Sequence, residues 1–486
     1  MADYTGFYAA FMAKDARFDG RFFAGIKTTG IYCRPICRAK RPKEKNCVFF
    51  KSAAEAEQAG FRPCLLCRPE QAPGTSITDA GARLAFHAAK MLEQSCGSGQ
   101  SLFELAVRLG CTDRHLRRVF AAEFNVTPVR YLQTCRLLLA KQLLTDTGLS
   151  VLDIAMAAGF GSLRRFNDLF RKHYRLSPTA LRKRLPEEFN RSNAITLSLG
   201  YRPPYLFDEL LQFLAGRAIP GVEVARNGEY WRTVRLYDSA GRELRGWLRV
   251  GQRTKENALD VTVSETLLPV LPQVLSRVRY LFDLYCDPQS VSEKLSVMND
   301  LRPGVFAAGT RLPGCFDAFE MSVRAILGQQ ITVKAATTIT SRFAATFGTE
   351  IQTGIEGLTR LFPTARDIFT LEAPVENQLG PLGIIASRAK AIFALAGMLE
   401  CGELDLGFGS EPEAGIKKLM QIPGIGSWTA KYITMRTTGW TDGFLETDAA
   451  VKKALAPLTA KEMLTLSESW RPWRSYAVMN IWNSLQ

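Results

Sequence analysis

Hydrophobic and polar positions alternate differently in successive parts of the chain. Four stretches between residues 195 and 302, ITLSLGY, EYWRTVRLY, RGWLRVGQ and ALDVTVS, alternate with a period of two. This period is typical of strands with one buried face, so we predict an antiparallel sheet, with helices at DELLQFLAGRA and PVLPQVLSRVRYLFDL. Residues 303–486 carry helical patterns instead. The carboxy-terminal part is therefore predicted to hold an α+β unit followed by a helical unit.

Two segments in the middle of the chain share one internal layout, residues 101–120 and residues 150–170. Each begins with a serine that can cap a helix, continues with an apolar helix that contains an alanine, and turns at a glycine. A threonine or serine then caps a second helix that carries arginines. This layout predicts two helix–turn–helix units joined by a helix over PVRYLQTCRLLLAKQLL, with a plain helical bundle as the alternative.

The second helix of each unit is the one expected to enter the major groove of DNA. We expect His115 and His173 to face phosphate or lie on the surface, without a role in metal binding. The candidate DNA-binding residues on these helices are Arg114, Arg117, Arg118, Arg164 and Arg165.

The net charge of +15 is concentrated in the amino-terminal part of the chain. Residues 1–190 contain 30 Lys and Arg against 17 Asp and Glu, whereas the remainder contains 32 against 30. A region this basic favours a polyanionic partner, although a merely basic surface is the alternative. No apolar run reaches the ~18 residues of a membrane helix, and we find no signal-peptide pattern. We therefore expect a cytoplasmic, nucleoid-associated protein of bacterial type, with reduced thiols and no membrane partner.

Four cysteines form two close pairs, Cys33 with Cys37 and Cys64 with Cys67. Within each pair both sulfurs can face one ion, and four thiolates make a closed tetrahedral Zn²⁺ site. A strand at 48–50 and a short helix at SAAEAEQAG would fold over the ion. The alternatives are four unrelated buried cysteines or a purely structural zinc site. A zinc-bound thiolate is a nucleophile, and nearby basic side chains would bring it a phosphate. These basic residues are Arg34, Arg38, Lys40, Arg41, Arg62 and Arg68.

The stretches FAGIKTTGIYCRPICRAK and AGFRPCLLCRPE closely resemble the amino-terminal domain of the Ada-type DNA alkylation-repair regulators. The resemblance implies that Cys33 accepts a methyl group from a methylphosphotriester in DNA. It also implies that the zinc centre loses one negative charge on methylation, so that DNA binding tightens. Lys40 stands where an arginine is usual in the family. The implied DNA-contacting residues are Thr29, Arg38, Lys40 and Arg62.

The tandem layout of residues 85–185, with the ending HYRLSPTALRKR, resembles an AraC-type DNA-binding domain. The resemblance implies that this part of the chain binds promoter DNA and activates transcription. We therefore expect RNA polymerase as a protein partner.

The stretch LMQIPGIGSWTAKYITMR places a Pro-Gly-Ile-Gly turn between two predicted helices. Gly424 and Gly426 would let the backbone approach a phosphate, and N–H groups at the start of the second helix would bind it. This pattern indicates a helix–hairpin–helix motif, although PGIG alone fits any tight turn. Asp448 follows in GFLETDAAVKKAL, where it could cap a helix, serve as a catalytic carboxylate, or do both. Aromatic side chains near it would stack on a positively charged, alkylated base that has been flipped out of the duplex.

Residues 195–486 closely resemble the AlkA-type 3-methyladenine DNA glycosylases, including YRPPY, FLAGRAIPGVE and RLPGCFDAFEMSVRAILGQQIT. The resemblance implies that Asp448 is the catalytic carboxylate and that Gln329 and Gln330 belong to the wedge that fills the gap left by the flipped base. A leucine is found in a known bacterial member where this chain has Gln330. The implied base-pocket residues are Trp428, Tyr432, Trp482 and Phe213.

Bifunctional members of this superfamily carry a Schiff-base lysine where Trp428 stands. Its absence favours a monofunctional enzyme that leaves an abasic site, and it disfavours a glycosylase for oxidised bases. The resemblance also implies a possible monovalent cation at the hairpin. Its ligands would be the backbone carbonyls of Met420, Ile422 and Ile425.

The sequence therefore predicts a monomeric, multidomain α+β protein that binds double-stranded DNA, including alkylated and promoter DNA. The predicted parts are a small, zinc-bound Ada-type domain with four cysteine ligands at 1–78, an all-α AraC-type tandem helix–turn–helix domain at 85–185, an α+β, TBP-like AlkA subdomain at 194–305 and an all-α helix–hairpin–helix glycosylase domain at 306–486. Linkers are expected at 71–80 and 186–194. The alternative is a transcription regulator whose carboxy-terminal domain binds DNA without catalysis. The Pro-Cys-His-Arg run of Ada-type methylguanine methyltransferases is absent from the sequence, so repair of alkylguanine is not predicted.

Overall fold

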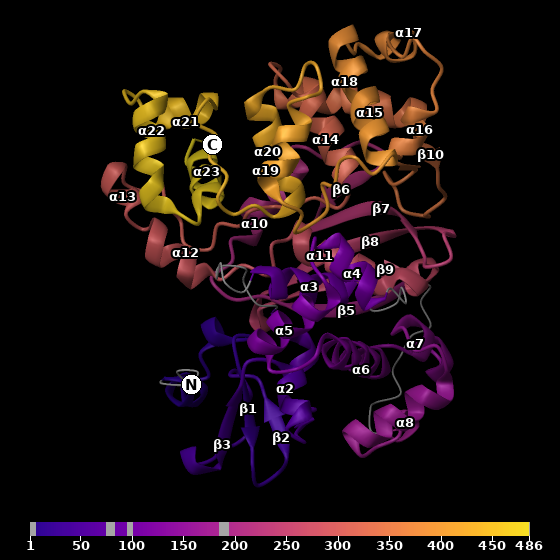
Figure 1. The fold of residues 1–486 in the computed structure, drawn as a ribbon, viewed down its shortest axis with the longest axis vertical. Coiled ribbons are helices and arrows are strands. Elements are labelled where there is room, and N and C mark those ends of the chain that lie inside the picture. Colours follow the sequence, from indigo (N-terminus) through magenta and orange to yellow (C-terminus); the bar gives the residue numbers. More distant parts are fainter. Residues whose placement is uncertain (1–5, 74–82, 95–100, 184–193, 486) are drawn as a thin grey trace.

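The computed structural model describes residues 6–73, 83–94, 101–183 and 194–485 (Figure 1). Most of the two expected linkers, 71–80 and 186–194, lies outside these residues, and the exact domain limits remain predictions. Within the described parts of the chain, no helix combines the length and the apolar character needed to cross a bilayer. The mixed helix and sheet content agrees with the predicted multidomain α+β class.

The amino-terminal unit is built on a small four-stranded sheet. Its strand order is β3-β1-β2-β4, with β1 antiparallel to β2 and β3, and β2 parallel to β4. The predicted strand at 48–50 lies within β3, and Ser52 caps the predicted short helix through the N–H of Glu55. The elements are α1 (Phe7–Met12), β1 (Phe23–Ile26), β2 (Ile31–Cys33), β3 (Cys47–Phe50), α2 (Ala53–Gln58) and β4 (Arg62–Pro63).

The middle unit contains the two predicted helix–turn–helix motifs. The four predicted caps all form, because Ser101, Thr112, Ser150 and Ser162 each accept a backbone N–H from three residues on. Gly110 and Gly159 adopt positive φ angles of 64° and 80° at the turns, a conformation that favours glycine. The helices are α3 (Arg83–Gln94), α4 (Leu102–Arg108), α5 (Asp113–Phe124), α6 (Pro128–Asp146), α7 (Val151–Ala157), α8 (Leu163–Tyr174) and α9 (Pro178–Arg182).

Helix α6, which joins the two motifs, also binds the amino-terminal unit. Glu57 of α2 accepts hydrogen bonds from Tyr32 at 3.1 Å and from Thr134 of α6 at 3.0 Å. His173 of α8 lies 3.5 Å from the same carboxylate and contacts Gln133 at 3.1 Å. The expectation of a phosphate-facing or surface role for His173 is therefore wrong, because this side chain is mostly enclosed between the two units.

A buried ion pair forms a second connection between these units. Lys141 of α6 lies 2.6 Å from Glu70, and both side chains are only 1% exposed. Arg68 adds contacts with Glu70 at 3.1 Å and with Asp146 at the end of α6 at 2.5 Å. Burial alone would raise the pKa of Glu70, but the charges of Lys141 and Arg68 more than offset it and hold that pKa below its ordinary value.

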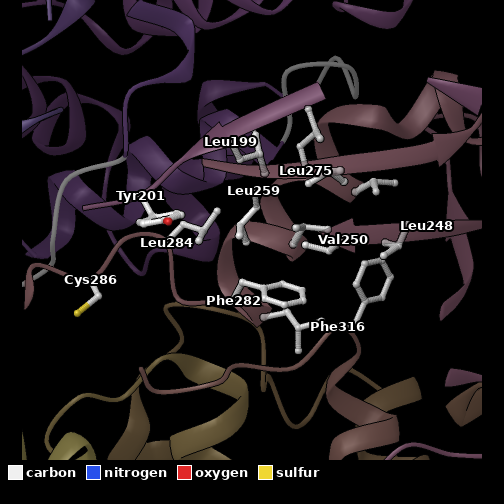
Figure 2. Packing of buried hydrophobic residues seen from close by; sticks show 14 of the residues in the cluster. Leu199, Tyr201, Leu248, Val250, Leu259, Leu275, Phe282, Leu284, Cys286 and Phe316 are labelled. Carbon is white, nitrogen blue, oxygen red and sulfur yellow. The ribbon is translucent and has the colours of Figure 1, made fainter. Parts of the chain in front are cut away.

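The third unit is an antiparallel five-stranded sheet in the order β5-β9-β8-β7-β6. The four predicted strands are confirmed, whereas the short edge strand β6 was not predicted. Figure 2 shows its core, where Leu248 and Val250 of β8 and Leu259 of β9 face Leu275 of α11 and Phe282. The elements are β5 (Ala194–Gly200), α10 (Phe207–Ala215), β6 (Glu223–Arg226), β7 (Glu229–Tyr237), β8 (Glu243–Arg253), β9 (Ala258–Ser264) and α11 (Leu271–Leu281).

The carboxy-terminal unit is helical, as predicted, apart from two short strands, β10 (Thr349–Glu350) and β11 (Arg360–Leu361), that pair with each other. Most of its helices fall into two groups, which Figure 1 shows in orange and yellow, and the two short helices that precede them are salmon. One group packs around its own core, whereas α23 extends the core of the five-stranded sheet. The helices are α12 (Pro288–Leu295), α13 (Met298–Leu301), α14 (Ala318–Leu327), α15 (Val333–Phe347), α16 (Ala365–Phe369), α17 (Glu376–Leu379), α18 (Ala386–Glu400), α19 (Pro412–Leu419), α20 (Ser427–Thr438), α21 (Ala449–Ala454), α22 (Ala460–Ser467) and α23 (Arg474–Asn483).

Lys141→Met should destabilise the protein by about 3–5 kcal/mol, because it leaves the buried Glu70 carboxylate without its main counter-charge. The stability that this pair supplies is present above the ordinary pKa of 4.5 and is lost as the pH falls through the lowered pKa of Glu70. Urea unfolding at pH 7 and at pH 4 measures both effects. The exposed Lys172→Met is the control, and equal unfolding midpoints for the two variants would contradict the role given to Lys141.

Candidate functional sites

Asp448 lies where three helices meet. It caps α21, because its Oδ1 accepts the backbone N–H groups of Ala450 and Val451, each at 3.0 Å. The same oxygen accepts the indole N–H of Trp482 on α23 at 3.0 Å, and Oδ2 accepts that of Trp428 on α20 at 3.1 Å. Asp448 is therefore both a helix cap and a half-buried carboxylate that four N–H donors hold in one orientation.

Aromatic side chains surround this carboxylate. Trp428 and Tyr432, one turn apart on α20, stack with ring centroids 5.1 Å apart at 22°. Trp482 meets Tyr432 edge to face at 5.9 Å. These rings, together with Phe213 of α10 and Asp448, line one cavity of about 430 Å³. The structure thus brings together all four predicted pocket aromatics and the predicted carboxylate, although they come from three separate helices and a loop.

Arginines that the sequence reasoning missed lie among these rings. The guanidinium of Arg217 is 3.7 Å from the centroid of the Phe213 ring, and that of Arg436 is 5.0 Å from it. Arg436 also donates to the Tyr432 hydroxyl at 2.9 Å. Burial alone would raise the pKa of Tyr432, but the neighbouring guanidiniums more than offset it and lower that pKa. The aromatic pocket therefore already holds cationic groups against its rings.

A buried group of charges forms another part of the cavity wall. Arg324 of α14 binds Glu223 at 2.9 Å and Glu320 at 3.1 Å, and Arg232 of β7 binds Glu320 at 2.7 Å. Arg324 also donates to the backbone carbonyl of Arg217, which follows α10. The charges compensate one another and fix α10 against α14. In the sequence, this group is indicated only by charged residues that stand within otherwise apolar helices and strands.

The predicted hairpin lies beside the cavity, between α19 and α20. Gly424 has a positive φ of 93°, Gly426 is the N-cap of α20, and both are exposed. The Gln329 side chain donates to the Gly424 carbonyl at 2.9 Å and to Thr429 at 3.1 Å, so it supports the hairpin from within. Gln330, the next residue, is exposed with a positive φ of 55°. Of the two predicted wedge residues, Gln330 is thus the one whose side chain faces solvent.

The four paired cysteines form a second candidate site, at the opposite end of the chain. Their sulfurs all lie within 4.8 Å of one another, and the backbone N–H of Arg34 donates to Cys67 Sγ at 3.3 Å. Cys33 ends β2 and is buried. Four thiolates this close would repel one another, so all four can be ionised only with a cation among them. This donor set fits Zn²⁺, which binds four thiolates tetrahedrally.

The basic residues around the cysteines divide into two groups. Arg34 is buried against Asp19, Arg68 is bound to Glu70 and Asp146, and Arg41 lies 4.1 Å from the Phe11 ring. These three guanidiniums support the fold. The predicted DNA-contacting residues are more accessible, since Thr29, Arg38 and Lys40 are exposed and Arg62 is half-buried.

The predicted recognition helices α5 and α8 present their arginines to solvent. Their opposite faces are buried, through Leu116, Phe120 and Phe124 of α5 and through Phe166, Phe170 and Tyr174 of α8. Arg117 is engaged in an ion pair with Asp113 at 2.9 Å, and Arg118 lies 3.3 Å from His115. The exposed arginines are Arg114, Arg117, Arg118, Arg164 and Arg165.

Protein-family models match the chain in four consecutive parts. They are the metal binding domain of Ada at residues 6–70, a helix-turn-helix domain at 105–184, the AlkA N-terminal domain at 196–317 and the HhH-GPD superfamily of base excision DNA repair proteins at 323–465.

The chain is similar to several named proteins. The probable bifunctional transcriptional activator/DNA repair enzyme AlkA of Mycobacterium tuberculosis is 34% identical over 493 residues, which cover 100% of this chain and 97% of that protein. The DNA-3-methyladenine glycosylase 2 of Escherichia coli is 36% identical over 59% of this chain and 96% of its own length. The bifunctional transcriptional activator/DNA repair enzyme Ada of Escherichia coli is 36% identical over 31% of this chain and 40% of its length.

The four-cysteine centre should hold one zinc ion per chain, measured by elemental analysis of the purified protein. Cys37→Ser should lose most of this zinc and unfold at a lower temperature, because a closed zinc site contributes to folding. Cys401→Ser removes an exposed cysteine outside the group and is the matched control. An unchanged zinc content in Cys37→Ser would contradict the assignment.

Proposed function

Because the chain belongs to the AlkA-type family of bifunctional transcriptional activator/DNA repair proteins, we propose that it excises alkylated bases with Asp448 and accepts methyl groups from methylated DNA on Cys33. The observation that carries the proposed excision is the set of four N–H donors that hold the Asp448 carboxylate inside an aromatic cavity. The proposed substrate is double-stranded DNA that contains 3-methyladenine or a similar alkylated base.

In the proposed reaction, the damaged nucleotide is flipped out of the duplex and its base enters the cavity. Alkylation gives the base a positive charge, and the stacked rings of Trp428 and Tyr432 favour a flat cation. The exposed hairpin at Gly424 and Gly426 would hold the DNA backbone, and Gln330 would occupy the gap in the duplex.

The glycosidic C–N bond then breaks, and its electron pair leaves with the base. The sugar becomes positively charged, and the Asp448 carboxylate stabilises this cation. Oδ1 already accepts three N–H groups whereas Oδ2 accepts one, so Oδ2 retains lone pairs for the sugar or for water. Water adds to the sugar carbon and loses a proton. Because Trp428 occupies the position of the Schiff-base lysine, the product is an abasic site.

At the second site, the Cys33 sulfur would attack the methyl carbon of a methylphosphotriester. The carbon–oxygen bond breaks, its electron pair returns to the phosphate oxygen, and the products are a thioether and an ordinary phosphodiester. Zinc, when bound, would keep the four sulfurs as thiolates, which are nucleophiles. Thr29, Arg38, Lys40 and Arg62 would hold the DNA backbone beside Cys33. The reaction is irreversible, so each chain would react once.

Methylation would convert the protein into an activator through charge. The thiolate centre loses one negative charge, which reduces its repulsion of phosphates. The arginines of α5 and α8 would then hold promoter DNA, and RNA polymerase would be the protein partner. We further propose that the protein acts as a monomer and that the carbonyls of Met420, Ile422 and Ile425 bind a monovalent cation at the hairpin.

Asp448→Asn should lower the release of 3-methyladenine from methylated duplex DNA at least about 100-fold, because the carboxylate charge is lost while the side chain keeps its size. Chromatography of the free base measures the rate, and the exposed Asp300→Asn is the control. DNA affinity and thermal unfolding establish that both variants are folded. If the wild-type protein is folded and binds DNA but releases no base, the protein is a transcription regulator without catalysis.

Incubation of the wild-type protein with duplex DNA that contains methylphosphotriesters should add one methyl group to the protein, and peptide mass spectrometry should locate it on Cys33. The methylated protein should bind unmodified duplex DNA severalfold more tightly at low salt, with a smaller difference at high salt. Unmethylated DNA is the control. A methyl group found on Cys37, Cys64 or Cys67 instead would refute the assignment of Cys33.

A further inference from the structure

One ion pair beside the base cavity has no part in the chemistry described above. The Lys431 amine lies 2.8 Å from Glu446 Oε1 and 2.7 Å from Glu446 Oε2. The two side chains are 23% and 16% exposed. The pair is therefore largely shielded from solvent and bound through both carboxylate oxygens, unlike the exposed pairs whose contribution is small.

The two partners belong to the two elements that build the site. Lys431 lies on α20, one turn after Trp428 and next to Tyr432, so its helix carries the stacked rings. Glu446 lies in the tight turn 445–448, which is closed by the Asp448 N–H donating to the Leu445 carbonyl at 3.0 Å. Leu445 is buried at the start of this turn, and Asp448 stands at its end. The ion pair thus fastens the middle of the turn to the aromatic helix.

The opposite charges of Lys431 and Glu446 also neutralise each other beside the site. Lys431 stands one turn after Trp428 on α20, the helix whose indole donates to Asp448. An uncompensated lysine there would oppose the positive charge that develops on the sugar. An uncompensated Glu446, two residues before Asp448, would add a second negative charge to the turn. Together the partners cancel, so the pair adds no net charge beside Asp448.

We infer that the ion pair of Lys431 and Glu446 is a positioning device, which holds the Asp448 turn at a fixed distance from the rings of α20. This inference rests on the proposed base excision. Lys431 and Glu446 act through Asp448 and touch neither base nor sugar. A displacement of a catalytic group by about 1 Å can cost 100-fold in rate, so even a small movement of the turn is measurable.

The test uses the full-length protein with Lys431→Met, Glu446→Gln and the charge-reversed double variant Lys431→Glu/Glu446→Lys. Each single variant should lower the single-turnover rate of 3-methyladenine release about tenfold. Affinity for a duplex with a neutral abasic analogue should stay within about twofold. The reversed pair should recover most of the lost rate. Lys461→Met, which removes an exposed lysine from α22, is the control for the lost charge.

Two results would overturn the inference. If Lys431→Met weakens binding to the abasic duplex and leaves the single-turnover rate unchanged, Lys431 contacts a phosphate instead of positioning the turn. If neither single variant changes the rate while Asp448→Asn abolishes it, the turn is held without the pair. A wild-type protein that releases no base refutes the proposed function itself, and this outcome is distinguishable from both.

Discussion

The hydrogen bonds that converge on the Asp448 carboxylate join three helices at the base cavity. Trp428 of α20 and Trp482 of α23 both pack against the core of the five-stranded sheet, whereas Ala430 and Ile433 of α20 belong to the core of the helical group. The backbone donors come from α21. Helix α20 therefore contributes to both hydrophobic cores, and the Asp448 carboxylate binds this helix to α21 and α23 at the cavity. The aromatic rings are held in place by the same contacts that fix the charge, which is the preorganisation that excision of a charged base requires.

In the amino-terminal half, buried carboxylates connect the zinc unit to the helix–turn–helix unit. Glu57 and Glu70 are buried carboxylates of the zinc unit, and their partners Thr134 and Lys141 lie on α6, between the two helix–turn–helix motifs. Removing Lys141 would take the main counter-charge from Glu70, and removing Thr134 would take a hydrogen bond from Glu57, so these contacts hold the zinc unit and the two recognition helices together. In the proposed mechanism, a change of charge at Cys33 therefore acts on a DNA-binding surface whose geometry is already set. The sensing chemistry and the excision chemistry use separate sites in one chain.

Local patterns in the sequence identified much of this architecture. Caps such as Ser101 and Thr112, turn glycines such as Gly110, and the period-two strands depend on near neighbours, so they could be predicted and are found. Pairs between distant elements could not be predicted in this way. The ion pair of Lys431 and Glu446, the contact of His173 with Glu57 and the charges around Arg324 have no periodic signal, because only the folded chain brings the partners together. The edge strand β6 is four residues long, too short for alternation to be recognised.

Stabilisation of a positively charged sugar by the Asp448 carboxylate is the central step of the proposed excision. The most direct measurement is the affinity of the protein for two duplexes that differ in one position, one with a cationic pyrrolidine in place of the sugar and one with a neutral abasic analogue. The wild-type protein should bind the cationic duplex much more tightly, because it resembles the transition state, and Asp448→Asn should lose most of this preference. Equal preference in the wild-type protein and in Asp448→Asn would contradict the account.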